Sequence, residues 1–353
     1  EACVAPWTYG TSLAYMQQVC AHWHDHYDWR RAEARINAHE NYLVTLGDKK
    51  VHVLIEPGSG SAPRTLVLTH GWPGSIFEYL DIVGPLAHPE KYGGRIEDAF
   101  TVILPSLPGY GFSEPPEKPV PPREVAALWH ELMTEVLGCD SYFAQGGDWG
   151  AIITSWLALD YPDTMTAMHL NLSAFMPTVA DMDMSEIERA WMSAYLSRRA
   201  KEVAYHQING TKPQTLAYGL QDSPSGCAAW VLEKFRTWSS KTADPMTLPF
   251  GTDHLLDNVM MYWLNGSNAP AWLYCSVLDG TGRSPPEGQK VDVPTGFLLF
   301  PDDIALPAPR DWLDRSYADI RQYRVADTGG HFAAFESPDI IIEDLRTFFR
   351  NFR

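Results

Sequence analysis

An aspartate framed by small residues is the first feature of the sequence that could do chemistry. Asp148 is the centre of Gly146-Gly147-Asp148-Trp149-Gly150, which lies between the β-rich segment 141–145 and an apolar, helix-like segment that extends to residue 157. Glycines at such positions allow a sharp strand-to-helix turn that presents its central side chain. A carboxylate presented in this way attacks a saturated carbon and forms an alkyl ester, whereas a serine attacks a carbonyl group. The alternative is that Asp148 only caps the following helix.

A carboxylate nucleophile needs a base that activates water, and His331 is the candidate. It lies in Thr328-Gly329-Gly330-His331-Phe332, directly after the strand-like segment 323–326. Asp303 follows the strand-like segment 295–300, where it would orient the imidazole and stabilise its charged form. The order nucleophile, acid, histidine is the order expected for this kind of nucleophile turn. Asp302 is the neighbouring alternative, a turn after proline also explains both aspartates, and most histidines have structural roles.

Two backbone N–H groups, those of Trp72 and Trp149, are candidates for an oxyanion hole. Trp72 belongs to His70-Gly71-Trp72-Pro73-Gly74, the loop after the first core strand, and Trp149 follows the candidate nucleophile directly. Such donors stabilise the tetrahedral intermediate that forms when water attacks an ester. The alternative for the first loop is an ordinary tight turn. No Gly-x-Ser-x-Gly motif occurs, and Ser113 lacks the small residue that should follow a serine nucleophile.

The segments that must position these residues alternate between strands and helices. Helical spacing covers 11–38 and 338–350, and the strand-like segments are 50–56, 64–69, 100–105, 141–145, 167–172, 295–300 and 323–326. This alternation predicts an α/β fold with a mostly parallel sheet. Residues 174–288 have helical spacing and no clear strands, which predicts an inserted helical lid. We expect an N-terminal arm (1–60) that packs on the core, a core in two parts (61–173 and 289–353) and a lid (174–288).

Composition excludes several classes of function. The 353 residues carry a formal net charge of −17 with a pI near 5.0, which disfavours nucleic acids and anionic membranes because both require clustered basic residues. No apolar segment reaches the roughly 18–20 residues of a transmembrane helix, so we expect a soluble, cytoplasmic protein. The scattered cysteines are typical of free thiols, although a Cys3–Cys20 disulfide stays open. His22 and His26 share a helix face without a third ligand, so we expect no metal.

Four motifs together resemble the microsomal-type epoxide hydrolases. The resemblance implies an α/β-hydrolase fold with a helical lid, no cofactor, and conversion of epoxides to vicinal diols with water through an ester intermediate. It places the nucleophile on Asp148, the base on His331 and the acid on Asp303. Weaker similarity extends over nearly the whole chain. The motifs are His70-Gly71-Trp72-Pro73-Gly74-Ser75, Pro108-Gly109-Tyr110-Gly111-Phe112-Ser113, Gly146-Gly147-Asp148-Trp149-Gly150 and Gly329-Gly330-His331-Phe332-Ala333-Ala334-Phe335-Glu336.

The family also uses two lid tyrosines that hold and protonate the epoxide oxygen. The first corresponds to Tyr205, which is followed by Thr211-Lys212-Pro213. The second corresponds to Tyr274, although Trp272 and Ser276 occupy the positions where the family usually has an arginine and an acid. The resemblance implies a small apolar epoxide as substrate and a role in detoxification or aromatic hydrocarbon catabolism. The sequence does not decide whether the protein forms a homodimer.

Two other functions stay open. Haloalkane dehalogenases share the aspartate turn and often the Asp-Trp pair, but a halide needs N–H donors rather than an acid, and their residue at the Trp72 position is often asparagine. Tyr205 and Trp72 therefore favour an epoxide. The other alternative is a catalytically silent hydrolase-fold binding protein, which the intact set of Asp148, His331 and Asp303 disfavours.

Overall fold

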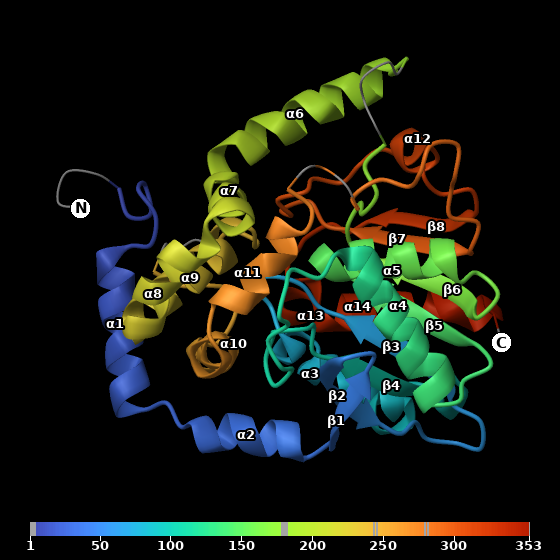
Figure 1. Cartoon of the computed structure of the whole chain (residues 1–353), viewed down its shortest axis with the longest axis horizontal. Helices are drawn as coiled ribbons and strands as arrows, with labels where there is room; N and C mark the ends of the chain where they lie inside the picture. Colours follow the sequence, from blue (N-terminus) through green and yellow to red (C-terminus); the bar gives the residue numbers. More distant parts are fainter. Residues whose placement is uncertain are drawn as a thin grey trace.

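An eight-stranded sheet forms the centre of the molecule (Figure 1). The computed structural model describes residues 5–352 except 178–182, 243, 245, 279 and 281. The strand order is β1-β2-β4-β3-β5-β6-β7-β8; β2 is antiparallel to β1 and β4, and the other neighbours are parallel. The predicted α/β fold with a mostly parallel sheet is confirmed. The strands are β1 Glu40–Leu46, β2 Lys49–Glu56, β3 Arg64–Thr69, β4 Phe100–Pro105, β5 Tyr142–Gly146, β6 Met165–Leu170, β7 Thr295–Leu299 and β8 Ile320–Val325.

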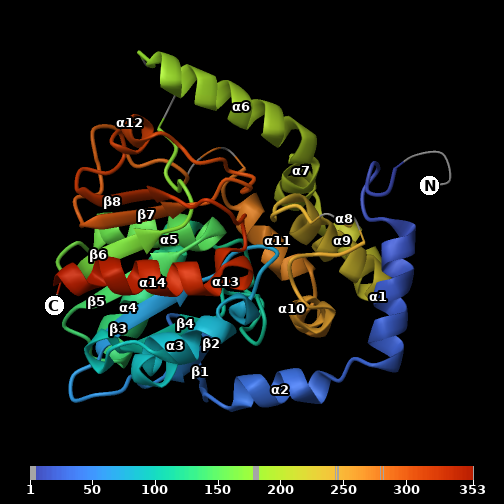
Figure 2. The ribbon, with the colours of Figure 1, turned by 180° about the vertical axis from the view of Figure 1, so that it is seen from behind.

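Helices cover both faces of the sheet (Figures 1 and 2). On one face lie α3 (Leu80–Ala87) and α14 (Pro338–Phe349), and on the other α4 (Pro122–Glu131) and α5 (Asp148–Asp160). Successive side chains of a strand point to opposite faces. Leu66 of β3 therefore packs in the cluster that includes α3 and α14, while its neighbour Val67 packs in the cluster that includes α4 and α5. Burial on both faces explains why the central strands have no polar alternation.

Helices follow one another in the described part of the chain between β6 and β7. Figure 1 shows α7–α10 to the left of the sheet, α11 between them and the core, and α6 extending outward. α6 begins with a capping box made by Ser185 and Glu188. Glu188 also accepts from Arg315 Nε at 2.6 Å, a charge pair that ties α6 to the segment after α12 (Arg310–Leu313). The lid helices are α6 Glu186–Glu202, α7 Ala204–Thr211, α8 Pro213–Asp222, α9 Pro224–Thr237, α10 Thr252–Asn265 and α11 Asn268–Cys275.

Two helices separate the N-terminus from β1. They are α1 (Leu13–Asp25) and α2 (Trp29–Asn37), where the helical spacing predicted a single segment. The break occurs because the side chain of Asp28 accepts from the backbone N–H of Arg30 and caps α2. α1 packs against α9 and α10, and His22 Nε2 lies 2.6 Å from Asp253 Oδ1 of α10. The first helix therefore contacts the lid, and α2 leads the chain back to the edge of the sheet.

Several short helical elements connect the strands and the longer helices. The short elements are η1 Ile76–Glu78, η2 Pro89–Tyr92, η3 Ile96–Asp98, η4 Leu132–Val136, α13 Ala333–Glu336 and η5 Arg350–Phe352.

No helix among the described residues has both the length and the apolar character needed to cross a bilayer. Cys3 lies outside the described residues, so the disulfide with Cys20 is untested; no two of the described cysteines are bonded to each other.

Candidate active site

Asp148 lies at the sharp turn between β5 and α5. Its φ of 47° is in the left-handed region, which side chains other than glycine rarely adopt. Gly146 and Gly150 cannot be replaced by larger residues, because neighbouring backbone atoms leave no room for a side chain. A Cβ on Gly146 would lie 2.2 Å from the carbonyl oxygen of Gly150, and one on Gly150 would lie 1.8 Å from that of Thr69. The strand-turn-helix context predicted for this motif is present.

The loop after β3 faces the carboxylate of Asp148. The backbone N–H of Trp72 donates to Asp148 Oδ1 at 2.8 Å. A Cβ on Gly71 would lie 2.2 Å from the same oxygen, so glycine is needed for this approach. Trp149 is in the first turn of α5, where backbone N–H groups have no acceptor inside the helix. The Trp72 N–H is thus bonded to the carboxylate, and the role of the Trp149 N–H as the second oxyanion donor stays a prediction.

The loops after β7 and β8 bring Asp303 and His331 to the other side of Asp148. His331 Nε2 lies 3.4 Å from Asp148 Oδ2, and Nδ1 lies 3.0 Å from Asp303 Oδ1. Asp303 and His331 are both buried, with exposed fractions of 3% and 4%. The backbone N–H of Ala305 donates to the same Oδ1 at 2.8 Å and holds the carboxylate in place. Asp303, rather than its neighbour Asp302, is therefore the residue that faces the imidazole.

Opposing effects act on the imidazole of His331. Burial lowers its pKa, but the carboxylates of Asp303 and Asp148 raise it further, and the net result is a pKa well above the ordinary value. The charged imidazole is thus stabilised for as long as Asp148 carries its negative charge.

The two lid tyrosines come from α7 and α11 and meet over the turn. The ring of Tyr205 stacks on Trp72 at 5.0 Å between centroids and lies 5.7 Å from the ring of Tyr274. Burial raises the pKa of both phenols above the ordinary value, with a further contribution from nearby charges such as Asp148. The hydroxyl of Tyr274 has no hydrogen-bond partner among the described residues. Both phenols are therefore neutral and able to donate a proton.

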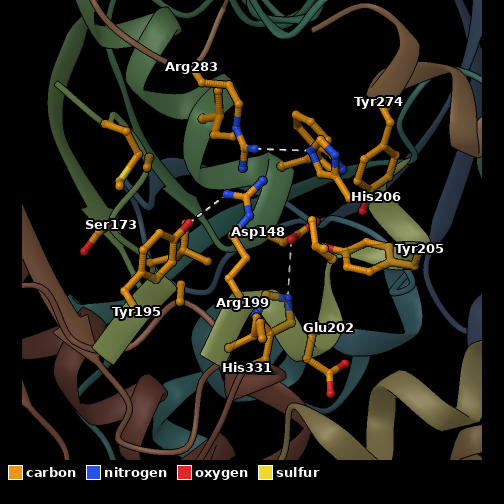
Figure 3. A pocket seen from close by; sticks show the side chains of 18 of the residues that line it. Asp148, Ser173, Tyr195, Arg199, Glu202, Tyr205, His206, Tyr274, Arg283 and His331 are labelled. Carbon is orange, nitrogen blue, oxygen red and sulfur yellow. Dashed lines mark hydrogen bonds and ion pairs between the residues drawn. The ribbon is translucent and has the colours of Figure 1, made fainter. Parts of the chain in front are cut away.

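One cavity connects these groups (Figure 3). Asp148, His331 and the two tyrosines share it with apolar side chains and with three basic side chains that the sequence did not suggest, Arg199, His206 and Arg283. Residues of α6, α7 and α11 line the cavity on one side, and the turns after the strands line it on the other. The apolar and small lining residues are Trp149, Ile152, Leu172, Ser173, Ala174, Met176, Trp191, Val203, Ile304 and Ala305.

Comparison with known proteins identifies the family. Residues 1–79 match the family described as epoxide hydrolase N terminus, and residues 64–338 match the alpha/beta hydrolase fold family. A Stigmatella aurantiaca protein that bears the name epoxide hydrolase is 38% identical over 352 residues, which are 99% of this chain and 79% of that protein. The chain belongs to the epoxide hydrolase family. Epoxide hydrolase 1 of Sus scrofa is 32% identical over 367 residues, 96% of this chain and 80% of that protein.

The fold agrees with this family. The crystal structure of juvenile hormone epoxide hydrolase from the silkworm Bombyx mori superposes with a TM-score of 0.85 at 27% sequence identity, and the match covers 99% of this chain and 87% of that one. The chain is thus an enzyme of the epoxide hydrolase family with an α/β-hydrolase fold, as the four motifs predicted.

Sequence reasoning missed a buried acid near the site. Glu78 is in η1, and burial raises its pKa to about 8, with smaller effects from His331 and Asp148. Burial also raises the pKa of Glu336 to about 7, and its carboxylate accepts from the backbone N–H groups of Ser240 and Phe332. The available signal for Glu78 was a lone acid in the apolar segment 76–80, a position where a charge is costly to bury.

No group of three potential metal ligands occurs in the part of the chain that the structure describes. His22, considered above as a ligand, bonds to Asp253, and its ring lies 5.6 Å from that of His26. This pair lies on α1, in the N-terminal arm, and we assign it no role in the chemistry of Asp148.

Proposed function

We propose that this epoxide hydrolase converts its substrate to a vicinal diol through a covalent alkyl ester on Asp148. The observation that carries the proposal is that Asp148 Oδ2 lies 3.4 Å from His331 Nε2, in a cavity that also contains two neutral phenols. A nucleophile, a base and proton donors are thus collected in one place, and each is held by its own element of the fold.

Alkylation is the first step of the proposed mechanism. Oδ2 of Asp148 attacks one carbon of the epoxide, and the bond between that carbon and the ring oxygen breaks. The ring oxygen takes a proton from Tyr205 or Tyr274, which becomes a phenolate, while the other tyrosine donates a hydrogen bond. Oδ1 is held by the backbone N–H of Trp72, which leaves Oδ2 as the attacking atom. Stabilisation of the departing oxygen lowers the barrier of this step.

Ester hydrolysis is the second step. His331 Nε2 removes a proton from water, and the hydroxide attacks the ester carbonyl carbon. The N–H groups of Trp72 and Trp149 stabilise the oxyanion. The intermediate then releases the diol, whose oxygen takes the proton from His331, and the proton of the new carboxyl group returns to the phenolate. Asp148 is restored as a carboxylate.

The charge of Asp148 links the two steps. Its carboxylate is one of the groups that raise the pKa of His331, and an ester has no charge. Alkylation therefore removes this contribution and lowers the pKa of His331, which favours the neutral imidazole that takes a proton from water. The carboxylate of Asp303, 3.0 Å from Nδ1, stabilises the imidazolium that forms when water is activated.

Haloalkane dehalogenation is the second candidate, because the indole Nε1 of Trp149 is buried and has no acceptor among the described residues. Such an N–H would suit a departing halide. Two neutral phenols beside Asp148 favour an oxygen leaving group instead, since an alkoxide needs a proton and a halide does not.

Product analysis with styrene oxide and bromobutane tests the proposal. We expect diol from styrene oxide, no bromide from bromobutane, and no diol with the Asp148→Ala variant. Tyr218→Phe is the matched control for an altered but folded lid, because Tyr218 is 69% exposed on α8. Bromide release without diol formation would replace the proposal by dehalogenation, and a ligand that binds without any product would leave only a binding protein.

A further inference from the structure

Two arginines of the cavity are not explained by the mechanism above. Arg199 is near the end of α6, and Arg283 is in the segment between α11 and β7. Both line the same cavity as Asp148. Figure 3 shows the two guanidinium groups directed into the centre of this cavity, between Tyr195 on one side and Tyr205 and Tyr274 on the other.

Neither arginine has a carboxylate partner within 4.0 Å among the described residues. Arg199 Nη1 donates to the hydroxyl of Tyr195 at 2.9 Å, and Arg283 Nη1 donates to His206 Nε2 at 3.3 Å. Nε of Arg283 is buried and has no partner in the described part of the chain. Several other partly buried arginines are paired with acids, such as Arg315 with Glu188 and Arg350 with Asp98, whereas the buried Arg346 donates to the backbone carbonyl of Pro85.

The acids that line the cavity are bonded to other groups. Asp148 is held by Trp72 and His331 as described above. Oε2 of Glu202 accepts from the indole N–H of Trp238 at 3.2 Å and lies 3.5 Å from Lys234 Nζ. His206, the hydrogen-bond partner of Arg283, is a neutral imidazole, because burial and the two nearby arginines lower its pKa to about 4. The two guanidinium groups thus lack a matching anion of their own.

Partly buried guanidinium groups without an acid are costly unless a ligand supplies the negative charge. The planar fork of donors on arginine matches the two oxygens of a carboxylate. We propose that Arg199 and Arg283 bind a carboxylate of the substrate, so that the enzyme acts on epoxides that also carry an acid group. This inference rests on the proposed hydrolysis of epoxides and narrows its substrate class.

The position of the arginines sets the length of the substrate. Arg283 Cζ lies 5.5 Å from the ring centroid of Trp149, the residue that follows the nucleophile. The ring of its partner His206 lies 5.2 Å from the ring of Tyr274. The anion site is therefore about one aromatic ring beyond the groups that act on the epoxide. Ile152 and Met176 also line the cavity, and their apolar side chains suit an arene or a short alkyl chain as the spacer.

A matched pair of epoxides tests the inference. The pair is para-oxiranylbenzoate and the neutral para-oxiranylbenzamide, compared through kcat/KM. We expect the wild-type enzyme to prefer the benzoate by about 10-fold to 100-fold, the range for a hydrogen-bonded charge pair. Arg283→Met and Arg199→Met should each reduce this preference, because each should lower kcat/KM for the benzoate more than for the benzamide. Lys201→Met, which removes an exposed positive charge from the same helix α6, should keep it.

Equal kcat/KM for the two epoxides with the wild-type enzyme would overturn the inference. An equal loss of kcat/KM for both substrates in the arginine variants would also overturn it. That result would mean that the arginines position Asp148 and do not bind the substrate.

Binding measurements separate this inference from the proposed reaction. Calorimetry with para-vinylbenzoate and para-vinylbenzamide needs no turnover, and we expect tighter binding of the benzoate to the wild-type protein, with the difference lost in Arg283→Met. If the benzoate binds in this way but neither epoxide is hydrolysed, the anion site stands and the proposed hydrolysis fails. If the epoxides are hydrolysed but the two vinyl compounds bind equally, the anion site is refuted and the hydrolysis stands. Tighter binding of para-vinylphenylphosphonate than of the benzoate would refute the assignment to a carboxylate.

Discussion

Replacement of Tyr205 or Tyr274 by phenylalanine should slow the opening of the epoxide without slowing hydrolysis of the ester. Each hydroxyl is proposed to donate to the oxygen that leaves the carbon, and a hydrogen bond to a charged group contributes about 1.5–3 kcal/mol. Each single variant should therefore form the ester about 10-fold to 100-fold more slowly. The double variant loses both donors, and its loss should be about 3–6 kcal/mol if the two contributions are independent.

The structure indicates which single variant should show the larger effect. Tyr274 is 1% exposed, so water cannot easily replace its hydroxyl. The hydroxyl of Tyr274 has no hydrogen-bond partner of good geometry among the described residues, so its removal should cost little stability. The Tyr274→Phe variant should thus lie near the upper end of the range and melt within a few degrees of the wild-type protein.

Stopped-flow fluorescence can follow the two steps separately, because Trp72 stacks on Tyr205 and Trp149 lies against Tyr274. A single turnover with excess enzyme should show slow ester formation and a rate of ester decay within about threefold of the wild-type rate. Tyr218→Phe on the exposed face of α8 is the control for a general change in the lid. Wild-type rates of ester formation in both single variants and in the double variant would refute the assignment of the tyrosines.

Three further perturbations test separate parts of the account. His331→Gln should still form the ester but lower steady turnover by about 10²–10⁴-fold, so mass analysis should find alkylated protein; turnover at the wild-type rate would exclude His331 as the base. Gly150→Ala would place a Cβ 1.8 Å from the carbonyl oxygen of Thr69 and should yield little folded protein by circular dichroism, whereas a wild-type melting curve would show that the turn tolerates a side chain. Glu78→Gln should stabilise the protein at pH 8 more than at pH 5. Burial raises the pKa of this acid to about 8 in the folded state, so between its ordinary pKa and pH 8 the unfolded state loses a proton that the folded state keeps, and stability falls as the pH rises. The gain should approach about 3–4 kcal/mol at pH 8, and equal melting shifts at both pH values would contradict it.

Residues that act through short local patterns could be predicted from the sequence. Asp148 lies in a glycine-framed turn whose geometry follows from its own neighbours, and His331 lies in a loop directly after a strand. Asp303 needed the resemblance to the family, since Asp302 has the same local context, and the structure separates the two by the bond to His331. The roles of these residues, the lid tyrosines and the oxyanion donors stay predictions until the variants are measured.

Residues that act through packing were not predictable in the same way. Arg199 and Arg283 are separated by most of the lid, and only the arrangement of α6, α7 and α11 brings them to one cavity. Strand β1 was missed because it is an edge strand with mostly exposed side chains, which gives little apolar alternation. The predicted strand 167–172 is Met165–Leu170 in the structure, so it begins and ends two residues earlier. Its ends are set by parallel pairing with β5 and β7, which the composition of the segment does not reveal. The homodimer and the cytoplasmic location also stay predictions.

A single turnover in heavy-oxygen water tests the central claim most directly. Excess enzyme reacts with styrene oxide, and mass analysis then follows the label in the diol and in the peptide that contains Asp148. If an ester forms on Asp148, water attacks its carbonyl carbon, so the first diol should carry no label and the label should be found in the carboxylate of Asp148. A labelled diol with an unlabelled Asp148 peptide would mean that water attacks the epoxide directly, and the account of Asp148 as the nucleophile would be wrong.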